Sequence, residues 1–259
     1  MIDIGANLTN SAFAADLDAV LDRAADAGVE RIIVTGTDVG SSAAAVDLCA
    51  RYSPRLYCTV GVHPHHAANA SGAWLDEIER LAGSPFVRAI GETGRDFNRN
   101  YSPRTEQHTV FDAQLDLAAR VRLPVFVHDR DAGTAVAAHL ERHHDLRDVV
   151  IHCFTGDESQ LRRYLELGCH IGITGWICDE RRGGELQALV AHIPDDRLLI
   201  ETDAPYLLPR TIAPRPKSRR NEPANIGWIA RTIAHARGQS VEHVRVVTTS
   251  NARRVFALD

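Results

Sequence analysis

Four residues with metal-binding side chains each stand at the end of a short apolar run of this sequence. They are Glu92, His128, His152 and Asp203, and their runs begin at Val87, Val125, Val149 and Leu198. A buried β-strand that ends in such a residue carries the side chain to the rim of a sheet, beside the ends of neighbouring strands. Imidazole nitrogen and carboxylate oxygen both bind divalent metal ions. The sequence therefore predicts one metal site drawn from four strands, and a metal-dependent hydrolase is the leading hypothesis.

Strand-like and helix-like segments alternate along the chain. Eight apolar runs rich in Val, Ile and Leu fit strands over residues 2–6, 31–35, 56–61, 87–92, 124–128, 149–152, 170–173 and 198–201. Helical periodicity lies between them over residues 13–28, 43–51, 73–81, 105–119, 132–141, 159–167 and 185–192, and again over 223–237, 241–248 and 251–256. Parallel strands joined by helical crossovers are buried on both faces, which explains why the eight runs remain apolar.

Eight such units favour a TIM-type (β/α)8 barrel. The chain has 259 residues, a length that suits one barrel of this kind, and no long linker divides it. We therefore expect one hydrolase domain over residues 1–259. A doubly wound open sheet is the alternative, because periodicity does not show whether the eighth strand meets the first.

Composition indicates a globular protein without a membrane span. Hydrophobic residues make up 44% and charged residues 24%, and no apolar run approaches the ~20 residues of a membrane helix. The start, Met1-Ile-Asp-Ile4, does not have the pattern of a signal peptide. Five cysteines without a Cys-x-x-Cys pair imply neither a disulfide framework nor a zinc knuckle. We expect a monomer in the cytoplasm.

The residue types at the four strand ends suit hydrolysis by an activated water. Functional side chains of such barrels lie at the carboxyl ends of the strands. A glutamate can bridge two cations, a histidine offers one nitrogen, and an aspartate can ligate a metal or orient water. His63 and His65, which follow the third run, are further candidates as ligands or phosphate contacts. Each residue alone has a plainer structural interpretation as a hydrogen-bonded rim residue or a helix cap.

Basic residues gather in the loops that follow the strands, although the net charge of −5 argues against general nucleic-acid binding. The basic residues are Arg95, Arg99, Arg130, Arg181, Arg182, Arg210, Arg215, Lys217, Arg219 and Arg220. Guanidinium groups suit phosphate oxygens, so a local basic rim favours a phosphodiester substrate. In the same loops Tyr101, Phe154, Trp176 and Tyr206 could stack on bases or simply pack. Arg95, Arg130 and Arg220, with His65, are the predicted phosphate-binding residues.

Several motifs give the chain a resemblance to a known family. They are Gly61-Val-His63-Pro-His65, Ala89-Ile-Gly-Glu92-Thr-Gly-Arg-Asp96-Phe97, Val125-Phe-Val-His128, His152-Cys-Phe-Thr-Gly156, Glu201-Thr-Asp203-Ala-Pro-Tyr-Leu207 and Arg220-Asn-Glu-Pro223. In this order and spacing the chain resembles the TatD family of metal-dependent deoxyribonucleases over nearly its whole length. The run from Gly172 to Arg182 adds to this resemblance.

The resemblance implies an amidohydrolase-like barrel that binds divalent metal and removes nucleotides from DNA. It implies a 3′ to 5′ exonuclease that prefers single strands, with RNA as a possible further substrate. It also implies that Glu92, His128 and His152 are metal ligands and that Asp203 is the catalytic aspartate, which ligates metal or orients water. His63 corresponds to a histidine near the substrate phosphate.

The chain departs from the family pattern at its first strand. Most members have a His-x-His pair after the first aspartate, whereas Asp3 is followed here by Gly5 and Asn7 at those positions. Glycine offers no side-chain ligand and asparagine is a weak one, so we expect one tight metal site and a second, weak site that exchanges Mg²⁺. Mn²⁺ and Zn²⁺ are alternative ions. Arg95 also replaces a usually aliphatic residue.

Two other functions are consistent with parts of the sequence. Related barrels hydrolyse small esters or amides, and a fold alone does not choose among substrates. A non-catalytic nucleic-acid-binding scaffold could also result from loss of the first-strand histidines. The basic rim argues against the first alternative, and the four remaining ligand positions argue against the second.

Overall fold

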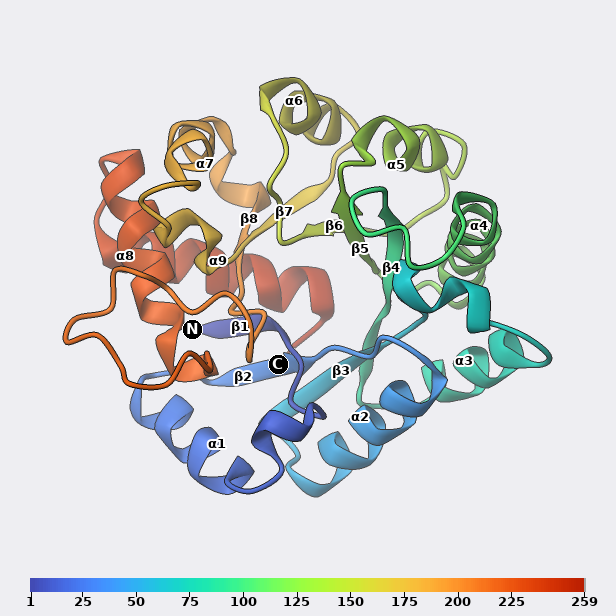
Figure 1. Ribbon diagram of the computed structural model, residues 1–259, viewed down its shortest axis with the longest axis horizontal. Helices are drawn as coiled ribbons and strands as arrows, with labels where there is room; N and C mark the ends of the chain where they lie inside the picture. The colour runs from blue at the N-terminus through green and yellow to red at the C-terminus, as the bar shows by residue number, and fades with distance from the viewer. Residues whose placement is uncertain (259) are drawn as a thin grey trace.

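Eight parallel strands form a barrel surrounded by helices in the computed structural model, which describes residues 1–258 (Figure 1). The strands follow chain order around the barrel. They are β1 Ile2–Ala6, β2 Arg31–Val34, β3 Leu56–Val60, β4 Val87–Asp96, β5 Val125–Arg130, β6 Val149–His152, β7 His170–Ile173 and β8 Leu198–Ile200. The helices are α1 Leu17–Asp26, α2 Val39–Arg51, α3 Trp74–Ala82, α4 Arg104–Val121, α5 Gly133–Leu140, α6 Glu158–Glu166, α7 Gly184–Leu189, α8 Ile226–Arg237 and α9 Val241–Phe256. The predicted TIM-type barrel is therefore confirmed.

The barrel closes between β8 and β1 through side-chain and loop contacts rather than a long ladder. An isolated parallel bridge joins Ala6 to Ala204. Below it, the buried Asp3 carboxylate accepts hydrogen bonds from the backbone N–H of Thr202 at 2.9 Å and from its hydroxyl at 2.5 Å. Because these contacts join β1 to the residues that follow β8, the sheet is a nearly closed barrel and not the open, doubly wound alternative.

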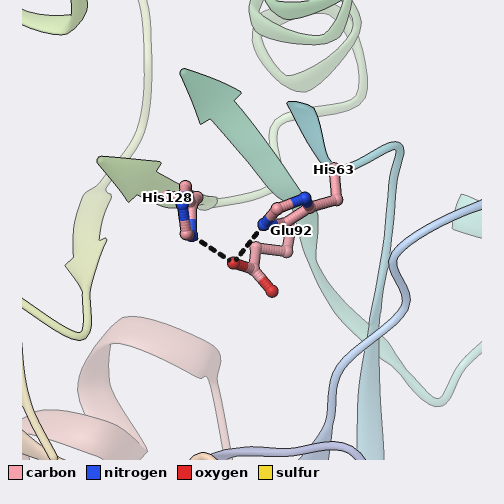
Figure 2. Close-up of side chains that lie close together, drawn as sticks. All are labelled: His63, Glu92 and His128. Carbon is pink, nitrogen blue, oxygen red and sulfur yellow. Dashed lines mark hydrogen bonds and ion pairs between the residues drawn. The ribbon is translucent and has the colours of Figure 1, made fainter. Parts of the chain in front are cut away.

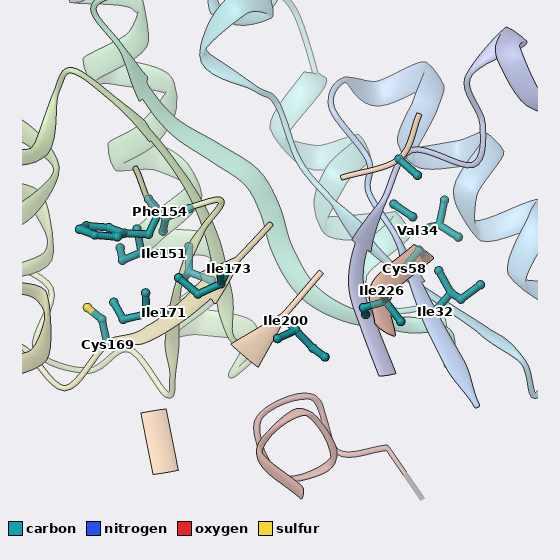
Figure 3. Packing of buried hydrophobic residues seen from close by; sticks show 14 of the residues in the cluster. Ile32, Val34, Cys58, Ile151, Phe154, Cys169, Ile171, Ile173, Ile200 and Ile226 are labelled. Carbon is teal, nitrogen blue, oxygen red and sulfur yellow. The ribbon is translucent and has the colours of Figure 1, made fainter. Parts of the chain in front are cut away.

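Alternate strand residues face two separate apolar layers. Ile33 on β2 and Phe126 on β5 point into the barrel lumen, where Val255 and Phe256 of α9 pack against the same cluster. Residues such as Ile171 and Ile173 on β7 belong to the outer layer between strands and helices (Figure 3). Burial on both faces explains the continuous apolar runs.

Three elements differ from the predicted ones. The two segments expected over 241–248 and 251–256 form the single helix α9. Phe13 lies in a short 3-10 helix, Ser11–Phe13, ahead of α1. The third difference is that β4 does not end at Glu92 but continues to Asp96, pairing Gly94 with His128 and Asp96 with Arg130.

The extension of β4 depends on glycine at position 94. Gly94 has φ +138°, and a Cβ there would lie 2.0 Å from the carbonyl oxygen of His128. Only a residue without a side chain lets the two strands approach so closely with this backbone conformation. The strand consequently carries Arg95 and Asp96 alongside the end of β5.

Candidate metal centre

The predicted site residues from five different elements line one cavity at the carboxyl ends of the strands. The cavity has a volume of about 570 Å³. Its walls include Glu92 from β4, His128 from β5, His152 from β6, His63 after β3 and Asp203 after β8. The fold thus brings together side chains that lie far apart in the sequence.

Glu92 occupies the centre of the group. Its Oε1 lies 2.8 Å from His128 Nδ1, 3.3 Å from His63 Nε2 and 3.7 Å from His152 Nε2. Figure 2 shows the first two contacts, with both rings directed at one carboxylate oxygen. Because Glu92 is buried, its charge is stabilised by these three imidazoles rather than by water.

The histidines around Glu92 differ in their affinity for protons. Burial lowers the pKa of His63 to about 4, so this ring is neutral. Burial also opposes a charge on His128, but the neighbouring carboxylates of Asp96, 3.5 Å from Nε2, and of Glu92 raise its pKa to about 9. Burial alone would raise the pKa of the Glu92 carboxyl, yet the surrounding histidines hold it well below its usual range. The site therefore combines a carboxylate with strongly polarised imidazoles.

His63 uses both of its ring nitrogens within the protein. Its Nδ1 accepts a hydrogen bond from the backbone N–H of His65 at 3.0 Å. The ring proton must then lie on Nε2, which faces Glu92. His63 is thus oriented as a hydrogen-bond donor towards the cavity.

Asp96 is a site residue that the sequence motif contained but whose role we did not predict. Its Oδ2 lies 2.7 Å from His65 Nε2, and its Oδ1 accepts hydrogen bonds from the backbone N–H groups of Asn98 and Arg99. Asp96 therefore fixes both the His65 ring and the turn after β4. Its place in the Glu92-Thr-Gly-Arg-Asp96 run was the available signal.

Glu201 is the second residue that sequence reasoning missed. Its side chain is fully buried, its Oε2 accepts a hydrogen bond from His152 Nδ1 at 2.6 Å, and its Oε1 accepts one from the backbone N–H of Cys153 at 2.7 Å. This contact directs His152 Nε2 towards the cavity. Its position at the end of the eighth run, two residues before Asp203, could have indicated the role.

The two positions that lack the family histidines have structural roles here. A Cβ at Gly5 would lie 2.3 Å from Glu201 Oε2, so glycine leaves room for that carboxylate. Asn7 donates from Nδ2 to Asp203 Oδ1 at 3.0 Å. Burial raises the pKa of the Asp203 carboxyl to about 7.

The donor set fits a divalent metal ion. Ligand atoms of His63, Glu92 and His128 lie within 4.8 Å of one another, and so do those of His152, Cys153 and Asp203. The buried Nε2 of His128 has no hydrogen-bond partner among residues 1–258. Buried imidazoles around a carboxylate, with one nitrogen unsatisfied, are what a metal-binding cluster requires.

Two of the four predicted phosphate contacts line the cavity. His65 and Arg130 are in its wall, and Arg130 donates to the Thr155 hydroxyl at 3.0 Å. The Arg130 guanidinium also lies 5.3 Å from the ring centre of Trp176, which lines the same cavity.

Arg95 and Arg220, by contrast, do not lie in the cavity wall. Because β4 continues past Glu92, Arg95 is buried beside α4 and α5, where it contacts His139 Nε2 at 3.0 Å and donates to the carbonyl oxygen of Arg104. Arg220 is held by Asp16 at 2.7 Å and by Glu222 at 2.9 Å. Both arginines thus make contacts within the protein outside the cavity wall, and their role in binding phosphate stays a prediction.

The aromatic residues of the loops also separate into two groups. Phe154 is 2% exposed and packs in the core. Tyr206 and Trp176 line the cavity, and Tyr101 is exposed with its ring centre 4.7 Å from that of His65. Three of the four aromatic side chains are therefore placed where a base could stack.

A parallel barrel with a histidine and carboxylate cluster at the carboxyl ends of its strands defines the class of metal-dependent barrel hydrolases. The family model for "TatD related DNase" matches residues 2–257. The chain belongs to this family and is thus a hydrolase of phosphodiester bonds.

Named relatives and solved structures agree with this membership. A "3'-5' ssDNA/RNA exonuclease TatD" from Pectobacterium parmentieri is 48% identical over 259 residues, which cover 100% of both chains. The protein of the same name from Salmonella typhimurium is 49% identical over 257 residues, covering 99% of this chain and 98% of the other. The solved structure of YJJV, a TatD homolog from Escherichia coli, has a TM-score of 0.92 at 30% identity, covering 100% of this chain and 98% of that one. A phosphotriesterase homology protein from Escherichia coli shares the fold, with a TM-score of 0.66 at 16% identity and 98% of each chain covered.

Proposed function

We propose that this chain is a divalent-metal-dependent exonuclease that removes nucleotides from the 3′ end of single-stranded DNA, and of RNA as a second substrate. The observation that carries the proposal is the buried Glu92 carboxylate, surrounded by three imidazoles in a cavity with Arg130 and Trp176 in its wall. The names of the relatives from Pectobacterium and Salmonella, both 3'-5' ssDNA/RNA exonucleases, support the substrate and the polarity. A cavity of about 570 Å³ suits one terminal nucleotide better than a duplex.

The metal would be held by Glu92, His128, His152 and Asp203. We propose one tight site at the two histidines and Glu92, and a weak site for an exchangeable Mg²⁺ beside Asp203, where Gly5 and Asn7 supply no strong ligand. Mn²⁺ and Zn²⁺ are the alternative ions at the tight site, because imidazole suits them well. A bound ion would supply positive charge against the phosphoryl oxygens and would lower the pKa of water.

The remaining steps fall to side chains of the chain itself. Asp203, whose carboxyl group lines the cavity, can take a proton from the attacking water. Asn7 holds its Oδ1, which leaves Oδ2 for that proton. His63 directs its Nε2 proton at Glu92, and it would donate that proton to a phosphate oxygen only when a metal ion takes Glu92 Oε1. His65, fixed by Asp96, and Arg130 bind the phosphate.

Two features support a monomer in the cytoplasm. All five cysteines are free, as is usual in a reducing compartment. The large hydrophobic side chains exposed among residues 1–258 are Tyr101, Tyr206, Val241 and Val246. The two tyrosines belong to the cavity region, and the two valines are too few for a stable protein interface.

Digestion of end-labelled oligonucleotides tests the proposal. A single-stranded oligonucleotide labelled at its 5′ end should give a ladder of shortening products with Mg²⁺, Mn²⁺ or Zn²⁺ and none with chelator. The same strand labelled at its 3′ end should release labelled mononucleotide at once. Cleavage of p-nitrophenyl esters without any cleavage of oligonucleotides would instead indicate the small-molecule hydrolase.

A further inference from the structure

The loop after β8 is the most basic stretch of the chain. Residues 204–221, here called the β8 loop, contain five basic residues and no aspartate or glutamate, in a chain of net charge −5. Figure 1 shows this loop in orange as a long excursion near β1 and α1. Its charge is therefore local and opposite in sign to that of the whole protein.

Ion pairs fasten the flanks of the β8 loop to the barrel. Arg210 pairs with Glu180 at 2.7 Å. Arg220 pairs with Asp16 at 2.7 Å and donates to the carbonyl oxygen of Ala12. The charges of Arg210 and Arg220, near the two ends of the loop, are therefore balanced by carboxylates of the barrel.

The middle of the β8 loop is different, because its cations have no partners. Arg215, Lys217 and Arg219 are exposed, and none of them makes a hydrogen bond or ion pair through its side chain with any other part of residues 1–258. Three like charges within five residues repel one another. Neither packing nor pairing explains why they lie together, whereas a polyanionic ligand does.

The β8 loop also begins beside the cavity. Tyr206 and Leu207, at its start, line the cavity. Asn10, another lining residue, donates from Nδ2 to the Tyr206 hydroxyl at 3.2 Å. A strand that leaves the cavity on the β1 and β8 side would therefore pass the exposed Tyr206 ring and then the three free cations.

We propose that Arg215, Lys217 and Arg219 bind the phosphate backbone of the single strand upstream of the nucleotide being removed. The inference rests on the proposed exonuclease function and adds to it a second binding surface, separate from the metal centre. Such contacts are independent of base sequence and hold the substrate without taking part in bond cleavage. Affinity should then depend on strand length, because a dinucleotide bound in the cavity does not extend to Arg215, Lys217 and Arg219.

The test compares a dinucleotide with a 20-nucleotide strand as substrates of the Arg215→Ser/Lys217→Ser/Arg219→Ser variant. KM for the long strand should rise on the order of tenfold at low salt, while kcat and the KM for the dinucleotide stay unchanged. The slope of log affinity against log salt should become shallower by about 2, since each phosphate contact to a single strand contributes about 0.7. The matched control is Arg51→Ser/Arg122→Asn/Arg231→Ser, which removes three exposed charges elsewhere and should leave these values unchanged.

The possible results separate this inference from the proposed function. Equal effects of both triple variants would reduce the result to net charge and overturn the inference. An unchanged KM and salt slope in the β8-loop variant, with normal digestion by wild type, would overturn the inference alone. Failure of wild type to digest either substrate with any metal would overturn the proposed exonuclease, and the inference with it.

Discussion

Glu201 accepts a hydrogen bond from His152 Nδ1 at 2.6 Å from within the barrel, where its side chain is fully buried. The contact fixes which nitrogen of His152 faces the cavity, since only Nε2 remains for Glu92 or a metal. Room for the Glu201 carboxylate comes from two glycines, because a Cβ at Gly5 or Gly172 would lie 2.3 or 2.4 Å from its oxygens. Glycine at position 5, where most family members have a histidine, thus helps to set the orientation of His152.

The Glu201→Gln substitution should weaken metal binding without changing the set of ligands. The new amide side chain would have nearly the same size but no charge, so His152 would be less basic and less firmly oriented. We expect a 10-fold to 100-fold loss of affinity for Mn²⁺ by calorimetric titration, the range typical of such outer contacts. Glu185→Gln, an exposed residue, is the control. An affinity equal to that of wild type would show that Glu201 does not position His152.

A side chain at position 5 should disturb the same contact. Gly5→Ala places Cβ against Glu201 Oε2 and 3.1 Å from the Phe126 ring, so we expect a loss of about 1–3 kcal/mol of stability together with weaker metal binding. Gly184→Ala is the matched control, because nothing lies within 4 Å of its Cβ. Urea denaturation and calorimetry measure the two effects.

Gly5→His should likewise not create a second tight metal site, because the imidazole would displace Glu201 before it could ligate. Calorimetric titration of this variant should show metal binding weaker than in wild type. Two tight and equivalent sites would contradict this explanation of the glycine, and also the proposal of one tight and one weak site.

Asp3 should make the stability of the protein depend on pH. Burial raises the pKa of its carboxyl from 3.8 to about 7 in the folded state. Between these values the folded chain holds a proton that the unfolded chain has lost, so stability falls as pH rises from about 4 to about 7. Relative to Asp3→Asn, which cannot titrate, wild type should lose up to about 4 kcal/mol of unfolding free energy over this range. A difference that stays constant with pH would show that Asp3 is ionised in the folded protein throughout.

Arg130 and Arg95 were both predicted from the sequence to bind phosphate, and their substitution should have different effects. Arg130→Gln removes a cation from the cavity wall and should raise the KM for oligonucleotides roughly tenfold, since a hydrogen bond to a charged group contributes about 1.5–3 kcal/mol. Arg95→Met removes a buried contact to His139 and should lower stability by about 1–3 kcal/mol with little change in KM. Steady-state kinetics and thermal unfolding of both variants decide the assignment. A raised KM in Arg95→Met with unchanged stability would restore Arg95 as a substrate contact.

The eight strands and the residues that line the cavity at their ends could be predicted from the sequence, because buried parallel strands leave a simple pattern. Each run of Val, Ile and Leu is apolar on both faces, and the residue that follows it must lie at the rim. His128 and His152 were therefore identifiable from their positions alone. Closure of the barrel was not visible, because it depends on contacts from Asp3 to a residue 199 positions away.

Two features could not be predicted in the same way. They are the buried residues that orient the side chains of the cavity, and the directions of long side chains. The position of Glu201 at the end of its run marks it as a candidate site residue, but its contact with His152 joins residues 49 positions apart and leaves no local pattern. Arg95 lies outside the cavity wall because Gly94 lets β4 continue, which brings the arginine to His139 of α5. The pairing of Arg220 with Asp16 was not visible, because the two residues lie 204 positions apart.

Replacing Glu92 by glutamine, and measuring metal binding and digestion on the same preparation, tests whether the cavity around Glu92 is where the metal binds and the phosphodiester is cleaved. Glu92→Gln keeps the size of the side chain but removes the charge that three histidines surround. We expect calorimetry to show loss of the tight metal site. The rate at which shortened products form from a 5′-labelled single strand should fall by at least about 10³-fold. Circular dichroism should show that the fold remains intact. Metal-dependent digestion at the wild-type rate by a folded Glu92→Gln protein would contradict the account, because the cavity would then not be the place where the phosphodiester is cleaved.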